Sequence, residues 1–133
     1  MSRYTRNAIY AYVSSTVQSV HDNVNCTSRY VPKPSSYPSC YIHEIDNYRP
    51  IVNTQLDFED SQWQSTFEVQ VISNKKGTAA SEAYSIMETV KAAFNSLYFL
   101  LLSETTIDGT ESFTVIARFR RQIGGGDTMP QLS

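Results

Sequence analysis

Apolar and polar residues change period twice between Trp63 and Leu102, and the changes outline a strand, a helix and a second strand. From Phe67 to Ile72 the side chains alternate with the two-residue period of a sheet strand. The polar segment 73–78 interrupts this pattern. Apolar residues then recur at helical spacing, at Ala83, Ile86, Met87, Val90, Phe94 and Leu97. The spacing predicts an amphipathic helix over 79–97, and the apolar run 98–102 predicts a return to the sheet.

The first third of the chain shows a second helical stripe. It comprises Ala8, Ile9, Tyr12, Val13, Thr16, Val17 and Val20, and it predicts a helix over 3–20. A short strand is expected over 25–31, with Cys26, Ser28 and Tyr30 on one side. The prolines of segment 32–38 predict a loop, because proline fits neither a helix interior nor a central strand. A strand over 39–45 should follow, with Cys40 and Ile42 on one face and Tyr41, His43 and Ile45 on the other.

Segment 46–62 is the least regular part of the chain. Residues 51–58 are strand-like but follow Pro50 and run into acidic residues, so we expect an extended strand or an arm that projects from the sheet. A turn at 108–110 then precedes a last strand over 113–120. The glycine-rich segment 124–133 predicts a mobile tail, or one that orders only on a partner.

The resulting order of helix, strands, helix and strands predicts an α+β fold. Both helices must bury their apolar stripes, and one face of a mainly antiparallel sheet of about four to five strands can cover them. We expect a single domain over 1–123, with part of its surface completed by another subunit across the long connection 46–62.

Composition narrows the classes of function. The formal net charge of −2 gives no general attraction to phosphate, so tight nucleic-acid binding is not expected. No segment approaches the roughly 18 apolar residues of a membrane span, and no signal-type region follows the polar start, so we expect a cytoplasmic protein. Tyrosine is abundant, at nine residues, while charged residues supply only 18%. A surface rich in tyrosine and poor in charge is suited to binding other proteins. The tyrosines could equally fill the edge of a small core.

The side chains that could carry chemistry lack the spacing of a known site. His21 and His43 belong to no zinc or nucleophile motif, and satisfied surface histidines explain both. Glu44 and Asp46, together with the acidic group Asp57, Glu59 and Asp60, form the one carboxylate cluster, which a solvated loop explains better than acid-base catalysis. Cys26 and Cys40 define neither a zinc site nor a disulfide framework and are interpreted as reduced packing residues. We therefore expect no enzymatic activity, metal or cofactor.

Two basic groups are candidates for contact with other subunits. Lys75 and Lys76 precede Gly77 and Thr78 in an order that does not match a phosphate-binding loop, so they should solvate the turn or pair with an acidic surface. Three arginines close the last strand. If these arginines pair with acidic residues across an interface, they set the register between subunits. Equally, they could protect an exposed strand edge from aggregation. The interface candidates are Asp57, Glu59, Asp60, Lys75, Lys76, Arg118, Arg120 and Arg121.

The whole pattern resembles the tail terminator proteins of long-tailed bacteriophages, also called tail completion or minor tail proteins. The resemblance covers residues 9–123. It is carried by the opening helix, the proline-rich loop, the strand 67–74, the helix 79–97, the final strand 113–120 and the segment Tyr37-Pro38-Ser39-Cys40-Tyr41-Ile42. The family is defined by the order of its elements and by the strand end at Ser73-Asn74. The resemblance therefore assigns no catalytic role to any side chain of this chain.

This resemblance implies a structural virion protein. Such a subunit forms a homohexameric ring that caps the tail tube, stops its polymerisation and presents a surface to the head-side connector. The implied partners are further copies of the chain, the tail tube protein and the connector, while genome DNA passes through a central channel without being held. A head-completion or stopper protein, a generic α+β binding module, and a small enzyme that uses His43, Glu44 or Asp46 are the alternatives.

Overall fold

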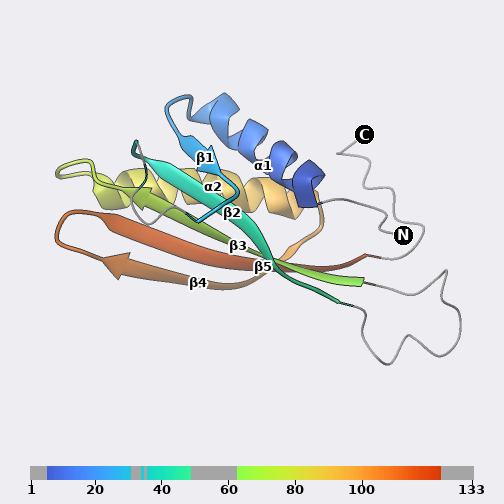
Figure 1. Cartoon of the computed structure of the whole chain (residues 1–133). Helices are drawn as coiled ribbons and strands as arrows, with labels where there is room; N and C mark the ends of the chain where they lie inside the picture. The colour runs from blue at the N-terminus through green and yellow to red at the C-terminus, as the bar shows by residue number, and fades with distance from the viewer. Residues whose placement is uncertain (1–5, 31–33, 35, 49–62, 124–133) are drawn as a thin grey trace, which may run out of the picture.

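The computed structural model describes residues 6–30, 34, 36–48 and 63–123. Within these residues, two helices and five strands follow one another (Figure 1). They are α1 (Arg6–Val20), β1 (Asn25–Thr27), β2 (Ser39–Tyr48), β3 (Trp63–Ser73), α2 (Ala79–Ser96), β4 (Leu100–Asp108) and β5 (Phe113–Ile123). This order confirms the sequence of helix, strands, helix and strands expected from the hydrophobic periods.

The strands form one sheet in the order β1-β2-β3-β5-β4. Strand β1 pairs with β2 in parallel, and the other three pairings are antiparallel. The central pairing of β3 with β5 runs in continuous register from Trp63 opposite Ile123 to Ser73 opposite Phe113. The expected α+β fold with a mainly antiparallel sheet is therefore confirmed.

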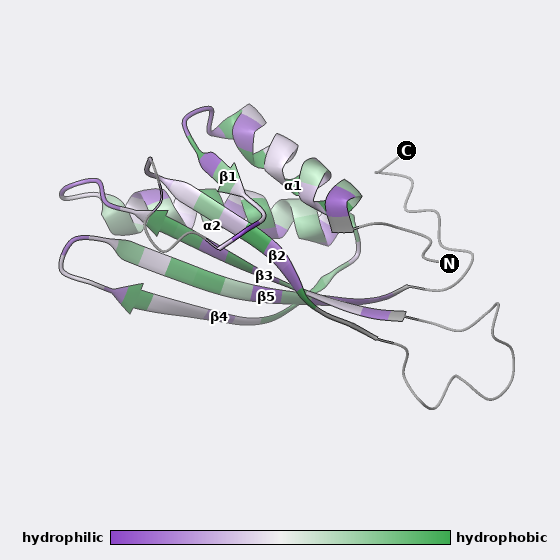
Figure 2. Ribbon diagram, in the orientation of Figure 1, coloured by the Kyte–Doolittle hydropathy of each residue, from purple (hydrophilic) through white to green (hydrophobic). Residues whose placement is uncertain are grey.

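Both helices lie on the same face of the sheet (Figure 1), so no helix of the described residues covers the opposite face. Positions that point toward the helices are apolar along most of β3 and β5, and the opposite face is more polar, apart from Ile72 and Ile116 (Figure 2). Helix α1 buries Ile9, Val13 and Val17 completely, which follows from their four-residue spacing. The core is thus a single layer between the helix pair and one sheet face.

Four phenylalanines form the centre of this layer. Phe94 of α2 stacks on Phe119 of β5 with ring centroids 4.4 Å apart, and it contacts Phe67 of β3 at 5.6 Å. Phe99, in the link between α2 and β4, meets both Phe67 and Phe94 edge-on. Aromatic pairs in these geometries stabilise a core beyond their buried area.

Helix α2 ends in a motif that directs the chain into β4. The Tyr98 N–H donates to the Asn95 carbonyl at 3.0 Å, and the Phe99 N–H donates to the Phe94 carbonyl at 3.0 Å. This is the Schellman arrangement, which requires a left-handed residue after the C-cap and usually places glycine there. Here the residue is Tyr98, with φ of 64°.

Three expectations about strand ends were wrong. Strand β5 continues to Ile123 instead of ending at residue 120, because β3 pairs with it as far as Trp63. Strand β1 stops at Thr27 instead of running to residue 31, because its ladder with β2 covers only Ser39 to Tyr41. Strand β2 continues through Tyr48, because β3 keeps pairing with it beyond an irregularity between Glu44 and Asp46.

Helix α1 ends at Val20, as expected, but its buried stripe is shorter than predicted. Val20 is 62% exposed, so the buried stripe of α1 ends at Val17. The first five residues, segment 49–62 of the expected arm, and the expected tail 124–133 lie outside the described residues. Neither helix in the described part of the chain is long and apolar enough to cross a membrane.

Candidate functional site

The two histidines occupy unrelated places. His21 follows α1, and its Nε2 lies 3.0 Å from the Thr89 hydroxyl of α2, which ties the helices together. His43 lies in β2 on the face opposite the helices. Among the described residues no group of three histidine, cysteine, aspartate or glutamate side chains is arranged to hold a metal ion.

The expected carboxylate cluster is described only in part. Glu44 accepts a hydrogen bond of 2.6 Å from the buried Ser65 hydroxyl of the neighbouring strand β3. Asp46 belongs to β2, opposite Thr66. The interface candidates Asp57, Glu59 and Asp60 lie outside the described residues, so their predicted role stays a prediction.

A polar row crosses the open face of the sheet. His43, Glu68 and Arg118 lie directly opposite one another on β2, β3 and β5. Arg118 Nε donates to Glu68 Oε2 at 3.0 Å, and His43 Nε2 lies 3.6 Å from Glu68 Oε1. Arg118 therefore has a partner within its own chain.

His43 is held in its neutral form by this environment. The Tyr41 ring stacks on it with centroids 4.3 Å apart, and its Nδ1 is buried without a hydrogen-bond partner. Burial lowers the pKa of His43, and this effect exceeds the opposing influence of Glu68. The contact with Glu68 is consequently a polar contact with a neutral ring near pH 7.

The arginines of β5 divide between the two faces of the sheet. Arg118 and Arg120 point to the open face, and both are exposed. Arg121 points to the helix side, where its Nη1 donates to the Leu97 carbonyl at 2.7 Å and its guanidinium lies 5.8 Å from the Tyr98 ring centroid. Arg118, Arg120 and Arg121 therefore do not form one basic patch, although they are close in sequence.

Lys75 and Lys76 occupy the exposed turn between β3 and α2. A shallow hollow joins this turn to the hairpin between β4 and β5, which contributes Asp108 and Glu111. The two lysines and these two carboxylates thus line the same hollow, and the role predicted for Lys75 and Lys76 at an interface stays a prediction.

Strand β4 is the most unusual surface of the described chain. It forms one edge of the sheet, and all nine of its residues are exposed. Leu100 is 68% exposed and Ile107 is 55% exposed, and Leu101 and Leu102 are exposed as well. A long edge strand with exposed apolar side chains is a template for pairing with another strand.

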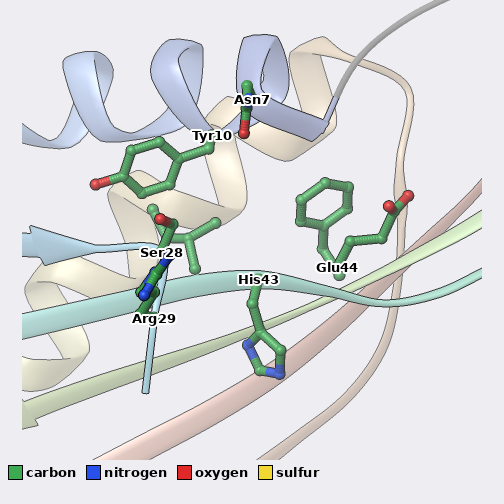
Figure 3. Close-up of a pocket in the computed structure, with 8 residues that line it drawn as sticks. Asn7, Tyr10, Ser28, Arg29, His43 and Glu44 are labelled. Carbon is green, nitrogen blue, oxygen red and sulfur yellow. The ribbon is translucent and has the colours of Figure 1, made fainter. Parts of the chain in front are cut away.

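The opposite edge is also largely uncovered. Strand β1 pairs with β2 only along Ser39 to Tyr41, and no other described strand pairs with the outer side of β2 beyond that point. A hollow opens there between α1 and the sheet (Figure 3). In Figure 3, Tyr10 reaches toward it from α1, and His43 points to the other side of the sheet.

Sequence reasoning did not find the β4 edge or the strained Tyr98. The sequence signal for this edge is the unbroken apolar run Leu100-Leu101-Leu102. An edge strand, with a neighbouring strand on one side only, usually alternates apolar and polar residues, and this run does not. A left-handed tyrosine leaves no such signal, because nothing in the local sequence requires a positive φ there.

Comparisons with known proteins give distant likenesses. No protein-family model matches the sequence, and no curated protein matches it. A chain of a solved structure described as the virion of a native gene transfer agent particle is similar at 13% identity and a TM-score of 0.49, over 93% of this chain and 100% of that chain. A second solved structure, which carries no descriptive name, is similar at 12% identity and a TM-score of 0.46, over 90% of this chain and 95% of that chain. Likenesses at these levels carry no functional assignment.

Proposed function

We propose that this chain is a structural protein of a phage-type virion, a tail terminator whose copies form a hexameric ring on the end of the tail tube. The ring stops polymerisation of the tube and offers a surface to the head-side connector. The sequence resemblance supports this role, and the observed order of elements agrees with that resemblance over the described residues.

The observation that carries the proposal is the exposed edge strand β4. Its backbone has a hydrogen-bonded neighbour, β5, on one side only, and it presents Leu100 and Ile107 to solvent. Natural monomers protect such edges with charges, proline or a covering loop. Only Glu104 and Asp108 carry charge along β4, and Glu104 is already paired with Lys91 of α2 at 2.6 Å.

The partner for this edge is a second copy of the same chain. The sheet of each copy has two different open edges, β4 on one side and β2 beyond Tyr41 on the other. Pairing the β4 of one copy with the β2 of the next is a heterologous contact, and such contacts generate closed rings when the rotation between copies is right. Every open edge is then covered.

A central channel of such a ring suits the charge of the chain. A net charge of −2 gives no general attraction to phosphate, so DNA passes without being retained. Tail tube protein and the connector contact the two faces of the ring.

A proline in the edge strand tests this interface. The Gly109 N–H donates to the Ser112 carbonyl at 2.9 Å across the β4–β5 turn. Because inward and outward groups alternate along an antiparallel ladder, the Thr106 N–H points away from β5. Thr106→Pro removes this outward donor without removing a bond to β5, and Thr106→Ala keeps it.

We expect Thr106→Pro to retain the far-ultraviolet circular dichroism of the native chain but to lose self-association in sedimentation velocity. The Thr106→Ala variant should associate like the native chain. If Thr106→Pro associates normally, β4 is not the interface. In virions that lack the chain, overlong or headless tails are expected, and heads that leak DNA would instead identify a stopper.

A further inference from the structure

Cys26 and Cys40 lie directly opposite each other on the parallel strands β1 and β2. Neighbouring strands lie about 4.8 Å apart, and disulfide-linked residues have Cα atoms roughly 4.4–6.8 Å apart. The pairing therefore places the two cysteines within bridging distance. Both are free thiols.

The two thiols have different surroundings. Cys40 is completely buried in the core, whereas Cys26 is half-buried at the edge strand. A hydrogen bond between them lowers the pKa of Cys26, and the same bond together with burial raises the pKa of Cys40. Cys26 is thus the more reactive and the more accessible thiol.

We propose that Cys26 and Cys40 form an intramolecular disulfide when the protein meets a low-molecular-weight disulfide such as oxidised glutathione. The Cys26 thiolate attacks one sulfur of this oxidant, forms a mixed disulfide and releases one glutathione thiolate. The Cys40 sulfur then attacks Cys26 and releases the second glutathione. The two protons of the cysteine thiols end on the two glutathione molecules, so two thiols are oxidised and one disulfide is reduced.

The crosslink would secure a weakly held part of the sheet. Strand β1 has only three residues. The Asn25 N–H donates to the Pro38 carbonyl at 2.9 Å, directly before the residues that pair with β2. A disulfide here closes the intervening loop in the unfolded chain as well, which raises the stability of the fold.

The biological setting of this step rests on the proposed function. Thiols stay reduced in a cytoplasm, where a virion assembles, and they oxidise in the medium after release. The crosslink would then fix β1 beside the open part of the β2 edge only in the finished particle. The chemistry itself can be tested on the purified chain, whatever its state of assembly.

The test is to treat the folded native chain with oxidised glutathione and measure the intact mass. We expect the mass to fall by that of two hydrogens, no glutathione adduct, no alkylation by iodoacetamide after unfolding, and a higher melting temperature. Reduction with dithiothreitol should restore the original mass, the alkylation by iodoacetamide and the original melting temperature. An adduct that persists on Cys26, or a disulfide between two chains, would overturn the proposal, as would two thiols that remain alkylatable.

Two variants separate the roles of the cysteines. Cys40→Ala should accumulate one glutathione on Cys26, because no second thiol resolves the mixed disulfide. Cys26→Ser should stay unmodified, because Cys40 is buried. Modification of Cys40 in Cys26→Ser at the rate seen for Cys26 would contradict the assignment of Cys26 as the attacking thiol. If one variant fails to fold, the mass change of the native chain still decides the proposal.

Discussion

Single residues of this protein show where local chemistry departs from the hydrophobic pattern. Tyr98 adopts a left-handed conformation that costs a non-glycine residue about 1–2 kcal/mol, yet its ring is 71% exposed. Arg121 partly compensates, since it binds the Leu97 carbonyl and lies over the tyrosine ring. Neither contact is encoded in a sequence period, so the sequence alone did not single out Tyr98, and the interface role predicted for Arg121 stays a prediction.

The environment of His43 predicts a dependence of stability on pH. Its folded-state pKa lies below the value of about 6.5 in an unfolded chain, so the unfolded chain binds more protons as the pH falls. Stability should therefore be lost as the pH drops through about 6.5 and should level off once the folded His43 is protonated.

The measurement is the urea midpoint of unfolding at pH 7.5 and at pH 5.5. His43→Gln should show a smaller decrease between the two pH values than the native chain, because it lacks this titration. Equal decreases in both proteins would show that His43 does not couple folding to protons.

Elements with one buried face could be predicted from the sequence, whereas the others could be predicted to exist but not where they end. Helix α2 and strands β3 and β5 bury most of their core-facing positions, so their periods are clear. The end of β2 lies beyond an irregularity in register, which shifts its alternation, and β1 ends where its neighbour no longer pairs. Strand β4 is exposed along its whole length, and its apolar run predicted that it exists but not where it ends.

Phe94 tests the packing between these elements. It is completely buried and touches rings from β3, β5 and the α2–β4 link, so Phe94→Ala removes contacts with three segments. We expect it to lower the free energy of unfolding by about 3–5 kcal/mol. Val20→Ala, at an exposed position on α1, should change it by no more than about 0.5 kcal/mol. Urea denaturation compares the two variants, and similar effects would show that the aromatic cluster does not hold the layers together.

At the scale of the whole molecule, the two helices cover only one face of the sheet and leave two of its edges open. The α+β architecture was predictable because both helical stripes need one common apolar surface. The surfaces for other molecules were less predictable, since exposed strand edges follow from which strands are neighbours and not from any local pattern. Each copy has an open β4 edge on one side of the sheet and a partly open β2 edge on the other, and this arrangement favours self-association over a monomer.

The most direct test of the ring is the native mass of the purified chain over a range of concentrations, measured by analytical ultracentrifugation. We expect a closed species of six times the chain mass of 15.0 kDa, which electron microscopy should show as a ring with a central channel. A stable dimer, or a chain that stays monomeric at every concentration, would contradict a ring built from the open edges of the sheet.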